Sequence, residues 1–358
     1  MSNATAMMRS VRSAPMFRDR TNTIATAMFG AILVYLGARF ARWAVVNAVW
    51  TVPPGVGSAP CRAVAGSGAC WAVISDRLRF ISLGTYPLDQ QWRPVVASLL
   101  FIALYAASAR RSWWKPGLFV LWLAVPALAI VLLRGGWFGL SSVATEFWGG
   151  LPLTFLLSTV SFALAFPFGV ALALGRRSEM PAVRTMSITY IELIRAVPLV
   201  SMIFMAAVMF PLFVPQSFTL DKLLRAHVAF VMVMSAYLAE VLRGGLQAIP
   251  KGQYEAAASI GLPYWPTTVM IVLPQAVRTT IPSIVNTFIG FFKDTSLVAV
   301  IGLFDLLGAA KAVIVDPKWV GFGVEVYLFV AAVYFTFTFS VSRYTQRLER
   351  VLSAERNH

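Results

Sequence analysis

Long apolar segments separated by short polar ones recur along the chain, and their lengths suit membrane-spanning helices. About 20 consecutive apolar residues cross a bilayer as a helix. Eight segments meet or approach this requirement: residues 24–50, 94–109, 117–133, 151–175, 187–213, 226–242, 275–292 and 324–341. The second is short, and Arg39 and Arg42 interrupt the first. The pattern predicts an all-α integral membrane protein with about eight spans.

Composition supports this prediction. Apolar residues make up 58% of the chain and charged residues only 13%, with a mean hydropathy of +0.73. An ordinary soluble domain carries about 25% charged residues. The first apolar segment follows basic residues, as in a signal peptide, but it lacks a convincing small-residue cleavage site. We therefore expect it to be retained as a helix.

The net charge of +15 raises the question of a nucleic-acid partner, but the placement of the basic residues favours another explanation. With a cytoplasmic N-terminus, the segments on the cytoplasmic side hold most of the 30 Lys and Arg residues. An excess of basic residues on one side is the orientation signal of membrane proteins. We expect a multi-pass protein of the bacterial inner (cell) membrane, with both termini cytoplasmic and no nucleic-acid partner.

The most informative stretch is residues 255–274, EAAASIGLPYWPTTVMIVLP. Helix formers and small residues begin it, Gly261 ends the predicted helix, and Pro263, Pro266 and Pro274 follow. This predicts a short helix that starts with Glu255, then a break and a second helical piece returning to the membrane. A Glu at a helix start suits the helix dipole and offers a charge to a partner protein.

This stretch resembles the EAA loop of binding-protein-dependent ABC importer permeases. The matching positions are Glu255, Ala256, Ala257, Gly261, Ile271, Leu273 and Pro274, and IELIRAVPLV, AYLAEVLRGGLQAIPKGQ and FKDTSL resemble the polar amino-acid branch. The resemblance implies a type I ABC importer permease with five core helices from residue 151 onward, preceded by three extra helices. Long members of this kind pair as two unlike permeases in general L-amino-acid importers.

The resemblance also implies the function and its partners. The chain would form half of a translocation path for L-amino acids, with a second homologous permease subunit, two ABC ATPase subunits and a periplasmic amino-acid-binding protein. ATP and Mg would be bound by the ATPase subunits, with no cofactor in this chain. The ATPase-coupling residues would be Glu255, Ala256, Ala257, Gly261 and Leu262.

The expected domain layout follows from the spans and this resemblance. A cytoplasmic N-terminal segment covers residues 1–23, and a transmembrane extension with a periplasmic loop at 51–93 covers 24–148. The permease domain covers 149–350 and contains the coupling loop at 243–274. Residues 351–358 form a cytoplasmic tail.

Several kinds of chemistry are missing from the sequence. It has no G-x-x-x-x-G-K-[ST] phosphate loop and no H-E-x-x-H, and its only histidines are His227 and His358. We therefore expect no catalytic residues and no metal site, and ATP hydrolysis in a separate subunit. Two alternatives stay open: an ion-coupled secondary amino-acid transporter acting without an ATPase, and a membrane scaffold. The first would need inverted repeats with a midplane ion site, and no clear repeat is present.

Ionisable residues at membrane depth are costly and therefore mark candidate functional sites. Glu192 and Arg195 are three apart and can pair on one helix face, with Pro198 breaking the helix after them to form a gate or a structural clamp.

The candidate substrate path combines two further groups. Glu240 lies one turn after Tyr237, and a salt bridge from Glu240 to Arg243 that anchors the loop is the simpler interpretation. Asp294 with Thr295 and Ser296 suits a substrate ammonium group, unless Lys293 neutralises the carboxylate.

Cys61 and Cys70 both lie in the predicted external loop. In an oxidising periplasm they can form a small disulfide loop, and the alternative is two free thiols in an ordered loop.

Overall fold

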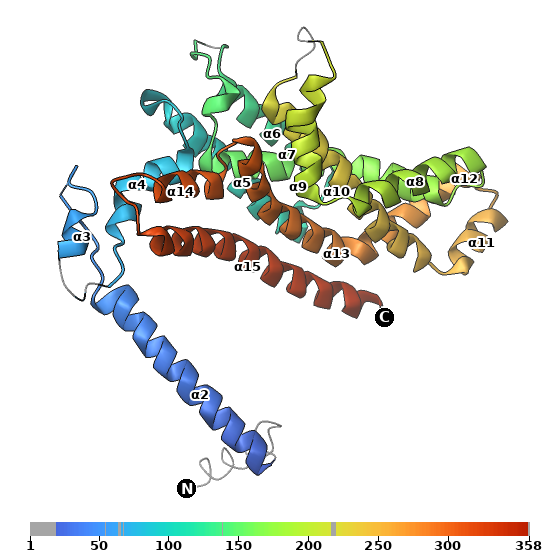
Figure 1. Cartoon of the computed structure of the whole chain (residues 1–358). Helices are drawn as coiled ribbons and strands as arrows, with labels where there is room; N and C mark the ends of the chain where they lie inside the picture. Colours follow the sequence, from blue (N-terminus) through green and yellow to red (C-terminus); the bar gives the residue numbers. More distant parts are fainter. Residues whose placement is uncertain are drawn as a thin grey trace. The chain divides into compact units, whose positions relative to one another are not determined.

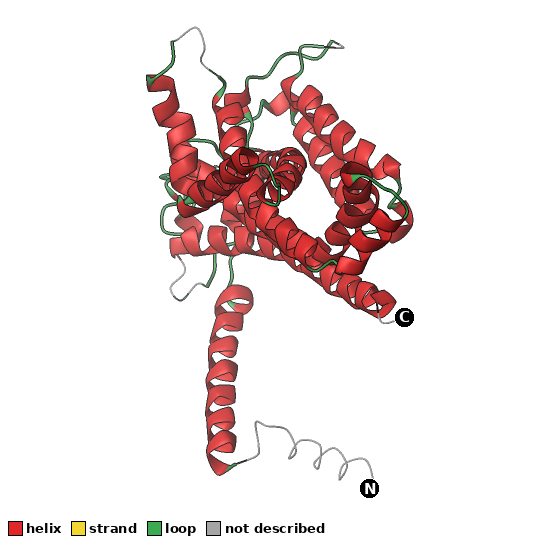
Figure 2. Ribbon diagram, turned by 90° about the vertical axis from the view of Figure 1, so that its right-hand side faces the viewer, coloured by secondary structure: helices red, strands yellow, loops and turns green. Residues whose placement is uncertain are grey.

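A computed structural model describes residues 19–356, except 54, 64, 65, 67, 138 and 216–219. The described part contains helices, turns and loops, with two isolated β-bridges and no strand (Figures 1 and 2). It divides into two compact units. The first contains residues up to Asp76 together with Asp316–Val326, and the second contains Arg77–Val315 and the chain from Tyr327 onward. Most of the expected segment 1–23 lies outside the described residues.

In the first unit, helix α2 (Arg20–Ala41) continues as a π-helix (Arg42–Val46). No residue of α2 is buried within the protein, as expected of a helix that faces lipid. The two helices together form a candidate span at Arg20–Val46, which lies four residues closer to the N-terminus than the expected span 24–50.

The rest of this unit is a small compact loop region with a short helix, α3 (Ala59–Ala63), and the first turn of α4 (Ala72–Leu83). Cys61 and Cys70 form a disulfide with a Cα–Cα distance of 5.9 Å. The Cys70 N–H donates to the Glu325 carboxylate (2.9 Å), and the buried Trp319 indole donates to Asp76 (2.8 Å). These bonds tie residues 316–326 to the disulfide loop.

The second unit is a helical membrane domain centred on α7 (Gly150–Arg176) and α10 (Lys222–Gln247). Small residues sit where its helices cross. A Cβ at Gly169 of α7 would lie 2.8 Å from the Leu238 Cβ of α10, and a Cβ at Gly245 would lie 2.7 Å from the Ala276 carbonyl oxygen. Without a hydrophobic force between helices in lipid, such close approach provides the packing energy.

Helices α5 (Trp92–Ser108) and α6 (Pro116–Arg134) pack on each other and against α7. Short 3₁₀ turns at Leu88–Gln90, Arg111–Trp113 and Thr145–Phe147 connect these elements. After α10 come α11 (Lys251–Ser259), α12 (Tyr264–Pro266), a π-helix (Thr267–Val272), α13 (Leu273–Asp294) and a 3₁₀ helix (Thr295–Ile301). The chain ends with α14 (Leu306–Ile314) and α15 (Gly323–Arg356).

The spans agree with the expected architecture. Six helices of the described part are long and apolar enough to cross a membrane, and the bent pair α8–α9 makes a seventh. Helix α5, with 17 residues, accounts for the remaining expected span. The expected span at 275–292 is much longer, because the helix runs without a break from Tyr264 to Ile301.

The expected span at 187–213 differs most. Helix α8 (Pro181–Ala196) and the segment that starts with α9 (Leu199–Phe204) and continues to Leu212 meet at a 100° bend. Val197 is extended (φ −95°, ψ 130°), because the residue before a proline is disfavoured in the helical region. Pro198 therefore breaks the helix, as the sequence predicted.

Helix α14 was not predicted, because it is too short for a span. Asp305 caps it by accepting hydrogen bonds from the Gly308 (2.8 Å) and Leu307 (3.3 Å) N–H groups. The Tyr334 hydroxyl of α15 donates to the same carboxylate (3.1 Å). Asp305 is fully buried. Burial raises its pKa to about 6, although the hydrogen bonds to the carboxylate act to lower the pKa.

Candidate functional site

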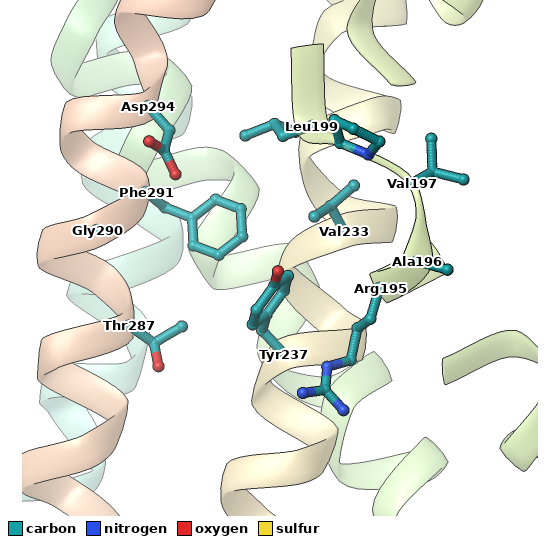
Figure 3. A pocket seen from close by; sticks show the side chains of 11 residues that line it. Arg195, Ala196, Val197, Leu199, Val233, Tyr237, Thr287, Gly290, Phe291 and Asp294 are labelled. Carbon is teal, nitrogen blue, oxygen red and sulfur yellow. The ribbon is translucent and has the colours of Figure 1, made fainter. Parts of the chain in front are cut away.

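A pocket of about 430 Å³ lies at the break between α8 and α9 and faces α10 and α13 (Figure 3). Its lining residues come from three places: Arg195, Ala196, Val197, Pro198 and Leu199 from the break, Val233 and Tyr237 from α10, and Thr287, Gly290, Phe291 and Asp294 from α13. Two of the three proposed gate residues, Arg195 and Pro198, therefore line the same cavity as part of the proposed substrate path, whereas Glu192 does not.

Opposite charges occupy different ends of this pocket. Figure 3 shows the Asp294 carboxylate projecting from α13 at one end and the Arg195 guanidinium at the other, with the rings of Phe291 and Tyr237 between them. No described side chain forms a hydrogen bond or ion pair with the Asp294 carboxylate, and the neighbouring Lys293 is exposed. An ionised carboxylate away from bulk water is costly without a partner, so this end of the pocket favours a cation.

Aromatic rings form the middle of the pocket. Tyr237 contacts Phe291 edge to face (5.8 Å between ring centroids), and the Arg195 guanidinium lies over the Tyr237 ring (5.4 Å). Between Thr287 and Asp294, Gly290 leaves open space, since a Cβ there would meet nothing within 4 Å. The pocket can thus accommodate a small molecule with two charged ends and a variable side chain.

A charged cluster next to the pocket joins three helices. Glu240 of α10 pairs with Arg176 of α7 (2.6 Å), with Arg243 of α10 (3.0 Å) and, more weakly, with Arg195 of α8 (3.8 Å). The salt bridge between Glu240 and Arg243 is therefore present. Glu240 does not line the pocket and acts on it through Arg195.

The expected pair of Glu192 and Arg195 is wrong. Glu192 pairs with Arg176 instead (3.0 Å), and Arg195 turns toward Tyr237 and Glu240. The spacing of three residues allowed the pair, but Arg176 at the end of α7 offers Glu192 a partner and leaves Arg195 free to reach the pocket.

The expected cluster around Asp294 is only partly assembled. Thr295 is fully buried and its hydroxyl donates to the Phe292 carbonyl (2.8 Å) in the last turn of α13. Ser296 does not line the pocket. Neither hydroxyl therefore supports a ligand beside Asp294.

The second candidate region is the loop between Gln247 and Tyr264. Helix α11 begins at Lys251, after Pro250, so Glu255 lies in its middle and the expected acidic first turn is wrong. Proline cannot continue the preceding helix, which sets the new start. At the other end, Gly261 (φ +76°) adopts the left-handed conformation, and the Gly261 and Leu262 N–H groups donate to Ala258 (2.9 Å) and Ala257 (3.0 Å). This is the Schellman pattern that ends helices at glycine, as the sequence predicted.

The loop presents a mostly apolar outer surface. Glu255, Ala256 and Gly261 are exposed, Leu262 is half-buried, and Ala257 packs inward. Large apolar side chains lie beside them on the surface: Ile260, Tyr264, Trp265 and Met270 are exposed by 73%, 58%, 64% and 73%. Exposed apolar patches of this kind indicate a contact with a protein or with the membrane, and Tyr264, Trp265 and Met270 belong to a candidate span.

Two contacts tie α11 to the membrane helices. Arg177, at the end of α7, donates to the Leu246 carbonyl (3.0 Å) and the Tyr254 hydroxyl (3.3 Å) and covers the Tyr254 ring. Gln275 of α13 donates to Gln253 of α11 (2.9 Å). Helix α11 is therefore linked to α7 and to α13, the helix that carries Asp294.

No cluster of three or more metal-binding side chains occurs in the described residues. The Ser161 hydroxyl contacts His227 (3.0 Å), but both are buried between α7 and α10, so this pair serves helix packing.

Comparison with known proteins decides the family. Residues 165–353 match the family described as the binding-protein-dependent transport system inner membrane component. The chain belongs to this family. The permease is similar to the inner membrane amino-acid ABC transporter permease protein YhdY of Escherichia coli K12. The two are 46% identical over 86% of this chain and 83% of the relative. It is 35% identical to the glutamate/glutamine/aspartate/asparagine transport system permease protein BztC of Rhodobacter capsulatus, over 95% and 92% of the two chains.

A solved structure described as an amino acid ABC transporter with histidines resembles the permease at 29% identity and a TM-score of 0.50. It covers 56% of this chain and 91% of the other. The chain is thus a multi-pass membrane protein with a type I importer fold and a non-catalytic transport role. No comparison supports a transporter acting without an ATPase.

Sequence reasoning missed Thr287, Gly290 and Phe291 as pocket residues and Arg176 as the central cation of the charged cluster. The first three had a readable signal, because positions 287, 290, 291 and 294 recur at helical spacing on one face of a span. Arg176 had no such signal in the sequence, since its partners come from α8 and α10, far along the chain.

Proposed function

We propose that this permease forms half of the translocation path for L-amino acids delivered by a periplasmic binding protein, and that the pocket at the α8–α9 break lies on that path. The observation that carries the proposal is the pair of opposite charges at the two ends of one cavity. An amino-acid zwitterion in a low-dielectric region needs partners for both of its charges. Asp294 is placed for the ammonium group and Arg195 for the carboxylate.

The middle of the pocket suits the substrate side chain. Tyr237 and Phe291 supply apolar contact, and Gly290 leaves room beside them. The named relatives carry glutamate, glutamine, aspartate, asparagine or amino acids in general, which supports an amino-acid substrate. Asp294 and Arg195 would bind the ammonium and carboxylate groups that all amino acids share, and the apolar middle of the pocket would accept different side chains. This arrangement suits a permease that transports several amino acids.

ATP is hydrolysed outside this chain in our proposal. Two ABC ATPase subunits bind ATP and Mg, and one of them receives the exposed surface of Glu255, Ala256, Gly261, Leu262 and the apolar residues around them. A second, unlike permease completes the path. When the ATPases close, α11 moves, and the contacts of Arg177 and Gln275 pass the motion to α7 and α13.

The distance over which this motion must act is known from helix geometry. Gln275 and Asp294 lie on the same helix, α13, about 28 Å apart at 1.5 Å per residue. Helix α13, which contains Pro282 between these two residues, links the docking loop to the pocket directly.

The proposed orientation places both termini and the coupling loop in the cytoplasm and the Cys61–Cys70 loop in the periplasm. Residues 24–148 form the N-terminal extension and 149–350 the permease domain proper.

Uptake of labelled amino acids into proteoliposomes tests the proposal. The complex with its ATPases is reconstituted, and a panel of L-amino acids is offered with and without the binding protein and with ATP or a non-hydrolysable analogue. Uptake that requires both ATP hydrolysis and the binding protein supports the proposal. ATP-independent uptake driven by an ion gradient would contradict it.

A further inference from the structure

A second cavity of the second unit is larger than the pocket described above and shares none of its lining residues. It is an apolar groove of about 970 Å³ between α5 and α6 on one side and α15 on the other, with α7 and α13 beneath. On α15 its lining runs from Phe329 to Leu348, about 28 Å along the helix. This length is close to the hydrocarbon thickness of a bilayer, about 30 Å.

The lining of the groove decides what can fill it. Aromatic side chains are its commonest members, among them Tyr105, Trp122, Phe155, Phe288 and Phe337. Close packing of a second helix needs small residues that let backbones approach. Such residues are a minority of the lining, namely Ala106, Ser108, Ala109, Ala332 and Ser340, so the lining favours a flexible hydrocarbon chain over a helix.

One end of the groove differs from the other in charge. The lining residues Ala109, Trp114, Tyr344 and Leu348 meet there, since the Tyr344 hydroxyl approaches the Ser108 carbonyl (3.5 Å) and the Trp114 indole donates to the same oxygen (2.9 Å). Exposed basic residues flank these positions in sequence: Arg110, Lys115, Arg343 and Arg347.

At the opposite end, no basic residue lies within two positions of Leu151, Leu306 or Phe329. The charge asymmetry therefore marks the end at Trp114 and Tyr344 as the one that meets an anionic group. Trp and Tyr are also the residues enriched at the membrane–water interface.

We propose that the groove is a binding site for an anionic phospholipid. Its acyl chain lies along α15 among the aromatic side chains, and its phosphate lies between the basic residues at 110 and 115 and those at 343 and 347. Basic pockets between transmembrane helices recognise anionic headgroups in this way, and each Lys or Arg near the surface contributes about 1 kcal/mol.

Binding is measured on the purified complex by native mass spectrometry with added phosphatidylglycerol, and with phosphatidylcholine as the zwitterionic comparison. The wild type should retain phosphatidylglycerol in preference. The double variant Arg343→Gln/Arg347→Gln should weaken phosphatidylglycerol binding by about 30-fold, the equivalent of about 1 kcal/mol for each charge. Arg20→Gln/Arg184→Gln is the matched control, because both residues are exposed and neither adjoins the groove lining.

Two further measurements test the acyl site. Ser340→Phe fills the groove and should lower retention of phosphatidylglycerol, whereas Ala331→Phe, exposed on α15 outside the lining, should not. Phosphatidylglycerol with a diazirine in its acyl chain should label lining residues of α5, α13 and α15 after irradiation. Equal retention of the two lipids, full retention by the double variant or by Ser340→Phe, or labelling confined to residues outside the groove would overturn the proposal. So would occupation of the groove by a protein segment in place of the lipid.

Discussion

Gly261 offers the sharpest test of the docking loop, because the fold of this chain requires only a left-handed backbone conformation there. Its φ of +76° favours glycine, and a Cβ at this position would meet no atom of the chain within 4 Å. Gly261→Ala should therefore cost only the left-handed backbone strain, about 1–2 kcal/mol. That is small beside a typical unfolding free energy of about 5–15 kcal/mol.

The comparison of Gly261→Asp with Gly261→Asn separates charge from size. Both side chains tolerate the left-handed conformation and have nearly equal volume. If the loop docks in an ATPase, the Asp variant places a charge in a close contact that the isolated chain does not contain. Losses at such contacts reach about 2 kcal/mol or more, a factor of about 30 in affinity.

The assay combines subunit stoichiometry after detergent extraction with ATP-dependent uptake. Membrane insertion and expression should be normal for all three variants, with co-purification of the ATPase and uptake strongly reduced for Asp and largely kept for Asn. Full uptake by Gly261→Asp at normal expression would refute the docking assignment.

Three further predictions follow from the fold. An impermeant maleimide should label Cys61 or Cys70 in whole cells only after reduction, and labelling that requires cell lysis would contradict the proposed periplasmic placement. Because the pKa of Asp305 is raised from 3.8 to about 6, protonation stabilises the fold; this contribution is complete below pH 3.8 and is lost as pH rises through 6. Asp305→Asn should therefore exceed the wild type in unfolding free energy at pH 8, by up to about 3 kcal/mol, and match it near pH 4; parallel pH curves for the two proteins would count against this. Gly245→Ala should lower stability by about 1–3 kcal/mol by forcing α10 from α13, whereas Gly244→Ala, with nothing within 4 Å, should not; equal thermal stability of the two would contradict the packing argument.

The spans and the docking loop could be predicted because their signals are local. Apolar length defines a membrane helix, and Gly261 ends α11 whatever surrounds it. The break at Pro198 could be predicted in kind, since proline restricts its neighbour, but the 100° bend depends on how α9 packs.

Pairings between distant helices could not be predicted. Arg176 takes both Glu192 and Glu240, and that choice depends on where α7, α8 and α10 meet. The same limit applies to Arg195, whose position in the pocket follows from the loss of Glu192 as a partner. Asp294 could be singled out as a charge at membrane depth. That Asp294 lines the pocket while Thr295 and Ser296 do not depends on how the helix is rotated, which the sequence does not give.

The most direct test of the central claim is the initial rate of amino-acid uptake by Asp294→Asn beside Lys293→Gln. The two variants change neighbouring charges, but only Asp294 lines the pocket, while Lys293 is exposed. Both complexes should assemble, and binding-protein-stimulated ATP hydrolysis is measured alongside uptake. We expect Asp294→Asn to reduce uptake at least tenfold while Lys293→Gln stays close to the wild type. Unchanged uptake kinetics in Asp294→Asn for every amino acid of the panel would show that the carboxylate is structural and that the pocket is not the substrate path.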